Sequence, residues 1–87
     1  MIGSILFQNN ISITHDPSYS AAQILKDKWT EIHTGIGVVT INNGYQSAAL
    51  VHKISNLYGS FILFGYAEAN VNFYILSGGN WSDGKTL

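Results

Sequence analysis

Three histidines are the side chains of this chain best suited to hold a metal ion: His15, His33 and His52 fall at nearly even spacing. Three imidazoles can bind zinc and leave a fourth position open for water. A metal site also needs ligands that converge in space, and we expect His15 after a short hairpin, His33 before a strand and His52 within one. Even spacing is not a ligand motif, so the sequence predicts no metal site and no cofactor.

Carboxylates are the next candidates, because hydrolysis of a glycosidic bond uses two acids that flank a cleft. Asp27 and Glu31 lie four residues apart near the end of a predicted helix, where a water-exposed helix face explains them. Glu68 is the only charged residue between Ile54 and Ser82, but the expected turn around it lets its side chain point into water. The sequence therefore predicts that the protein is not an enzyme.

Aromatic residues beside neutral amides offer a different chemistry, because aromatic rings stack on sugar rings and Asn or Gln can hydrogen bond to hydroxyl groups. Tyr45, Tyr58, Trp81 and Asn80 are the candidates for an exposed ligand-binding platform. The same residue types also fill the buried centres of protein interfaces. Residue type alone leaves both uses open.

The composition excludes several classes of protein. Charged residues make up 10% of the 87 residues, and four Lys with a net charge of −1 cannot produce the positive potential that nucleic-acid binding needs. No apolar run approaches the roughly 18 residues of a membrane helix, so we expect no membrane insertion. The chain has no Cys, which excludes disulfides and thiolate sites. Its length predicts a single small β-rich domain, residues 1–87.

Helix signals are confined to the first third of the chain. Ser20, followed three residues later by Gln23, fits a capping box, and apolar residues then recur at helical spacing. We predict one short helix over residues 20–29.

The rest of the chain has the pattern of a β protein. Ser4–Gln8 and Ile11–Thr14 are short β-prone runs that predict a small hairpin or one bent strand. Beyond Glu31 we expect a four-stranded antiparallel meander, with a two-residue hairpin turn at Asn43-Gly44. The predicted strands cover 35–41, 45–54, 60–66 and 71–76, with turns at 56–59 and 67–70. The expected fold is mainly β, an antiparallel meander or sandwich of about five to six strands with one short N-terminal helix.

The last two predicted strands carry apolar side chains on both faces, which requires a packed layer on each side. A chain of this size has little material for a second layer. We therefore expect another copy of the chain to supply it, with the contact made by Phe61, Leu63, Phe64, Phe73 and Ile75.

Three segments occur in a fixed order in the last two-thirds of the chain: Thr34-Gly35-Ile36-Gly37, Tyr58-Gly59-Ser60, and Phe73-Tyr74-Ile75-Leu76 before Gly78-Gly79-Asn80-Trp81-Ser82. This order resembles the C-terminal knob modules of phage and pyocin-type tail fibres, and the resemblance covers about residues 29–87. The chain departs from that family in having no basic residue in the aromatic strand and no second Trp after Trp81-Ser82.

This resemblance implies a virion protein, a homotrimer at the tip of a fibre that binds a saccharide or other receptor on the host surface. The alternative is a small β-rich oligomeric interaction protein that binds no carbohydrate. Both functions are noncatalytic, and both require the chain to self-associate.

Overall fold

Strands dominate the structure, a computed structural model that describes residues 9–65 and 71–86. In chain order the elements are β1 Asn9–Thr14, α2 Ala21–Asp27, the 3₁₀ turn η1 Trp29–Glu31, β2 Gly35–Asn42, β3 Gln46–Lys53, β4 Gly59–Phe64, β5 Val71–Ser77, β6 Asn80–Trp81 and β7 Lys85–Thr86. The predicted mainly β fold with one short helix before the meander is confirmed. The predicted turn at 67–70, with Glu68, lies outside the described residues.

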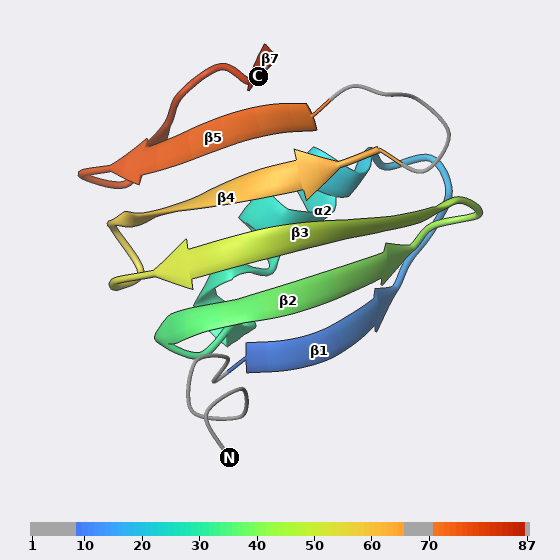
Figure 1. The fold of residues 1–87 in the computed structure, drawn as a ribbon, viewed down its shortest axis with the longest axis horizontal. Coiled ribbons are helices and arrows are strands. Elements are labelled where there is room, and N and C mark those ends of the chain that lie inside the picture. Colours follow the sequence, from blue (N-terminus) through green and yellow to red (C-terminus); the bar gives the residue numbers. More distant parts are fainter. Residues whose placement is uncertain (1–8, 66–70, 87) are drawn as a thin grey trace.

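The strands form one sheet in the order β1-β2-β3-β4-β5-β6, and β7 also pairs with β5 (Figure 1). β2 to β5 are the antiparallel meander that the sequence predicts. Among the described strands there is no second sheet, so the architecture is the meander and not the sandwich. The helical segment lies on one side of this sheet, as α2 behind the strands in Figure 1 shows.

β1 pairs with β2 in parallel, with Ile11 opposite Val39. Parallel neighbours need a crossover connection, and the segment that contains α2 and η1 supplies it. Ile11–Thr14 therefore lies in a strand as predicted, but its partner comes from the meander. Ser4–Gln8, the other arm of the predicted hairpin, lies outside the described residues.

Ser20 caps α2 as predicted, since its hydroxyl oxygen accepts a hydrogen bond from the backbone N–H of Gln23 at 3.2 Å. In a full capping box the Gln23 side chain would also bond back to the backbone of Ser20. Here the Gln23 side-chain amide instead donates to the Asp27 carboxylate at 2.8 Å. α2 ends at Asp27, two residues earlier than predicted, and the chain tightens into η1. There the Ile32 N–H donates to the Trp29 carbonyl at 3.2 Å.

Asp16 shapes the loop that enters α2. Its carboxylate accepts a hydrogen bond from the backbone N–H of Ser18 at 2.8 Å, and this bond holds the pKa of Asp16 below its ordinary value. Because the pKa is lowered in the folded chain, any stabilisation is present above the ordinary pKa of Asp and is lost as the pH falls through the folded value.

The β2–β3 turn has three residues, Asn43, Gly44 and Tyr45, where the sequence predicts a two-residue hairpin. Gly44 has a left-handed φ of 94°, but no non-glycine residue in the described ranges has a positive φ. Asn43 instead buries its side chain, whose amide donates to the Tyr19 carbonyl at 2.7 Å and ties the turn to the loop before α2. The two-residue turn occurs at Gly78-Gly79, where both φ values are positive, as a type I′ turn requires.

The core lies between the helical segment and one face of the sheet. Strand residues that alternate at period two reach the same face, and there they meet α2 and η1. The buried members are Ile24, Leu25, Trp29, Ile32, Val39, Ile41, Ala49, Val51, Phe61 and Leu76.

Trp29 is the main contact between the helical segment and the sheet. Its ring meets Trp81 edge-on, with centroids 5.0 Å apart, and its indole N–H donates to the Ser55 carbonyl at 2.9 Å. Gly59 in β4 leaves room for that ring, because a Cβ there would lie 2.7 Å from the His52 carbonyl oxygen and closer still to the indole. The sequence requires glycine at this position for packing.

Lys53 is a buried cation in the core face of β3, only 4% exposed. Its ammonium donates to the carbonyl oxygens of Trp29 and Ile32, each at 2.6 Å, and lies 5.9 Å from the centroid of the Trp29 ring. The Trp29 carbonyl thereby gains a second donor beside the Ile32 N–H, and the Ile32 carbonyl, just beyond η1, gains a donor from the side chain. Desolvation by burial lowers the pKa of Lys53.

We expect Gly59→Ala to lower the free energy of unfolding by about 1–3 kcal/mol, because the new methyl group overpacks the site against Trp29 and the His52 carbonyl. Urea unfolding at a fixed protein concentration measures the change. Ser60→Ala, one residue along β4 and on the other face, is the matched control and should change stability by less than about 0.5 kcal/mol. Equal stability of the two variants would contradict the packing described for Trp29.

Lys53→Met keeps the apolar stem but removes two hydrogen bonds to buried carbonyl groups, and the Trp29 carbonyl keeps only its bond from the Ile32 N–H. We therefore expect a loss of about 1–3 kcal/mol in the free energy of unfolding. Lys85→Met, on exposed β7, is the control and should be nearly neutral.

The pH dependence provides a second measurement on the same variants. Because the folded chain holds the Lys53 proton less tightly than the unfolded chain, stability should rise with pH between the lowered pKa and about 10.4. Lys53→Met should lose that part of the pH slope, whereas Lys85→Met should keep it. An unchanged slope in Lys53→Met would show that Lys53 is solvated in the folded protein.

Candidate functional site

The side of the sheet away from α2 and η1 is the outer face, and no described element covers it. The strand register fixes which side chains meet there. Val38 lies opposite Leu50, Leu50 opposite Ile62, and Ile62 opposite Phe73, so one apolar row crosses four strands. This row is the centre of the outer face.

On one side the row of Ala48, Phe64 and Val71 extends this apolar surface, and on the other side Ile36 and Ile75 are the ends of a row whose middle members are His52 and Ser60. Together they form the apolar band, which we define as Ile36, Val38, Ala48, Leu50, Ile62, Phe64, Val71, Phe73 and Ile75. Its exposed members include Phe64 and Ile75, each 44% exposed. On the outer face of β1 to β5, the described residues include no Asp, Glu, Lys or Arg, and Lys85 on β7 lies at the edge beside Phe73.

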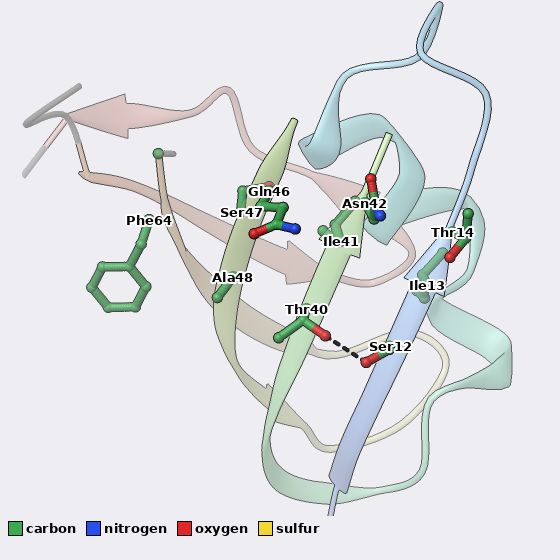
Figure 2. A pocket seen from close by; sticks show the side chains of 11 residues that line it. Ser12, Ile13, Thr14, Thr40, Ile41, Asn42, Gln46, Ser47, Ala48 and Phe64 are labelled. Carbon is green, nitrogen blue, oxygen red and sulfur yellow. Dashed lines mark hydrogen bonds between the residues drawn. The ribbon is translucent and has the colours of Figure 1, made fainter. Parts of the chain in front are cut away.

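A polar hollow of about 610 Å³ adjoins the band where β2 ends and β3 begins (Figure 2). Side chains from three strands and the exposed ring of Phe64 surround it, and Figure 2 shows the Thr40 and Gln46 side chains beside it. Its lining residues are Ser12, Ile13, Thr14, Thr40, Ile41, Asn42, Gln46, Ser47, Ala48, Phe64 and Gly65.

The chemistry of the polar hollow is uncharged hydrogen bonding. Ser12 and Thr40 hydroxyl groups lie 2.7 Å apart across β1 and β2. The Asn42 side-chain oxygen accepts a long bond of 3.4 Å from the Gly44 N–H, which leaves its NH₂ group for another partner. The Gln46 amide can both donate and accept. These groups can bind hydroxyl groups but hold no charge for an ion.

A second hollow, of about 310 Å³, lies between the loop before α2 and the β2–β3 turn. Tyr19, Tyr45 and the buried Asn43 contribute to its lining. The Asn43 side-chain oxygen has no hydrogen-bond partner within the described ranges. That oxygen is itself shielded from solvent, so we assign no ligand to this hollow.

The five predicted interface residues fall on two different faces. Phe61 is 1% exposed in the core and stacks on Tyr74 with ring centroids 4.7 Å apart, and Leu63 also packs against the core. Phe64, Phe73 and Ile75 belong to the outer face. A single subunit contact cannot use all five, because alternate residues of a strand point to opposite sides of the sheet.

The four predicted ligand-binding residues do not converge. Trp81 packs into the core against Trp29 and Phe61, with centroid distances of 5.0 and 5.3 Å, so its ring is not an open platform. Tyr45 precedes β3 and Tyr58 follows it, which separates them by roughly the 26 Å length of an eight-residue strand. Asn80 is exposed on β6, across from Ser77.

The titratable residues considered for chemistry are spread over the fold. The Asp27 carboxylate accepts a hydrogen bond from the Gln23 side-chain amide, and Glu31 forms an ion pair with Lys28 at 3.5 Å. The two acids therefore do not act as a pair. In the described part of the chain, no group of three or more His, Asp or Glu side chains is placed to hold a metal ion. No described helix has the length and hydropathy needed to cross a bilayer.

The residues of the polar hollow were not predicted from the sequence, although one signal was available. Thr40 and Asn42 precede the β2–β3 turn and Gln46 follows it, so period-two alternation around a hairpin places all three on one face. Ser12 joins them only through the parallel pairing of β1, which the local sequence does not indicate.

Comparisons of this chain with protein-family models, with curated proteins and with solved structures gave no match.

Proposed function

We propose that this protein is a noncatalytic binding module that holds an uncharged, polyhydroxylated ligand, a saccharide, in the polar hollow of the outer face. One observation supports the proposal above all: neutral hydroxyl and amide groups gather beside an exposed aromatic ring. A sugar ring has the matching chemistry, since its edge carries hydroxyl groups and its faces carry C–H groups.

The two sides of the hollow would bind different parts of a sugar. Thr40, Asn42 and Gln46 come from adjacent strands and offer donors and acceptors to several hydroxyl groups. Phe64, 44% exposed, offers apolar surface to a sugar face. The hollow is shallow and open, so it would bury only part of a ligand, and a dissociation constant in roughly the millimolar range is expected for one sugar unit.

The lining also supports a noncatalytic role. General acid–base catalysis needs a side chain that exchanges a proton near neutral pH, such as His, Asp or Glu. The described residues that line the hollow have hydroxyl, amide and apolar side chains, and none of them is His, Asp or Glu. These groups can hold a ligand through neutral hydrogen bonds, which is the role we propose.

The biological role we propose is the tip of a phage or pyocin-type tail fibre, on the basis of the sequence resemblance. In that role the hollow would contact a saccharide of the host surface, and the protein would be part of a virion. The Gly78-Gly79 turn and the core position of Trp81 give the resembling Gly-Gly-Asn-Trp-Ser segment a structural role. The alternative remains an oligomeric interaction protein without carbohydrate binding.

An array of neutral glycans, followed by titration of a retained glycan into isotope-labelled protein, tests the saccharide proposal. We expect backbone amide signals of Thr40, Asn42 and Gln46 to shift. Gln46→Ala should weaken binding by about 5- to 10-fold, the value of one hydrogen bond.

His52→Ala is the matched control, because His52 is exposed on the same face of β3 but lies toward its other end. It should bind as the unchanged protein does. No retained glycan at millimolar concentration would reject the saccharide proposal and favour the alternative. Binding that survives Gln46→Ala and shifts signals elsewhere would reject the polar hollow as the site.

A further inference from the structure

We propose that a second copy of this chain packs over the apolar band, so that the outer face is buried in a homo-oligomer. This goes beyond ligand binding in the polar hollow and uses an adjoining part of the same face, which shares Ala48 and Phe64 with the hollow. The inference rests on the register of the band, its size and its lack of charge.

The register makes the band continuous. The central row, Val38, Leu50, Ile62 and Phe73, runs unbroken across β2 to β5, and a row with Ala48, Phe64 and Val71 lies beside it. Side chains on one face of a sheet pack well against a second sheet about 10 Å away. A second copy offers the same rows, so each apolar row can be covered by an apolar row.

The size of the band fits a small contact between two copies. From a strand spacing of about 4.8 Å and a rise of about 3.3 Å per residue, β2 to β5 cover roughly 450 Å² per copy, measured flat. Two copies would then bury roughly 900 Å² before the roughness of the side chains is added, in the range of weak or transient interfaces.

The charge distribution favours a copy of the chain over other partners. The outer face of β1 to β5 has no Asp, Glu, Lys or Arg among its described residues, so two copies meet without repulsion between like charges. A nucleic acid or an anionic membrane surface would need a cluster of Lys or Arg, and Lys85 alone lies at the edge.

The same face shows the usual arrangement of an interface, an apolar centre with a polar rim. Ser12, Thr14, Asn42 and Gln46 lie at the side and end of the sheet, next to the band and outside its central row. A copy centred on Leu50 and Ile62 would cover the central row and leave the hydroxyl and amide side of the polar hollow at the rim, while Ala48 and Phe64 belong to both the band and the hollow. Self-association therefore limits access to the Phe64 side of the hollow and leaves its hydroxyl and amide side open.

Native mass spectrometry and sedimentation at micromolar concentrations test this inference. We expect the unchanged chain to have two or three times the 9.5 kDa mass of one chain. Leu50→Lys places a charge in the centre of the band and should raise the dissociation constant of the oligomer by at least about 100-fold. Leu50 is already 36% exposed in the single chain, so the variant should keep its fold, as circular dichroism can verify.

Leu57→Lys is the matched control, because Leu57 is also exposed but lies in the β3–β4 turn, away from the band. It should assemble as the unchanged chain does. A monomer of the unchanged chain at these concentrations would overturn the inference. An oligomer that persists in Leu50→Lys, or is lost equally in Leu57→Lys, would show that another surface makes the contact. Glycan binding is then measured on Leu50→Lys monomers. If the monomers still bind glycan, the self-association and the saccharide proposals are tested independently of each other.

Discussion

The packing of Trp29 against β4 fixes the helical segment to one side of the sheet, and the rest of the structure depends on that contact. The Trp29 ring needs the space left by Gly59. The backbone carbonyl of Trp29 accepts a hydrogen bond from the buried ammonium of Lys53. Together these contacts commit the short segment of α2 and η1 to the core face. No described helix is left to cover the opposite face, which is why the apolar band is exposed in the single chain.

Much of the fold could be predicted because it follows from local chemistry. Ser20 caps a helix through its own side chain, and the alternation of apolar residues from Gly35 onward defines strands of a meander. The features that were missed depend on contacts between distant residues. β1 pairs with β2 in parallel only because α2 carries the chain across the sheet, and Asn43 leaves the expected hairpin geometry because its amide bonds to Tyr19.

The candidate site was harder to predict than the fold, because the type of a residue does not reveal on which face of the sheet its side chain lies. Trp81 has the type expected of a sugar-binding residue, but it packs beside Trp29 in the core. Phe61 and Phe64 are both apolar and three residues apart, yet they lie on opposite faces of β4. Thr40 and Gln46 are individually unremarkable, and they become a site only when β1, β2 and β3 are aligned. Lys53 could have been recognised as buried, because it continues the inward alternation of Ala49 and Val51.

We propose that another copy of the chain covers the apolar band of the outer face. A soluble paramagnetic probe tests it directly, because the probe broadens the methyl signals that it can approach. We expect the methyl groups of Leu50, Ile62 and Ile75 to be protected at concentrations at which the chain assembles. Those of Ile54 and Leu57, which are exposed outside the band, should be broadened. Equal broadening in the two groups would contradict it.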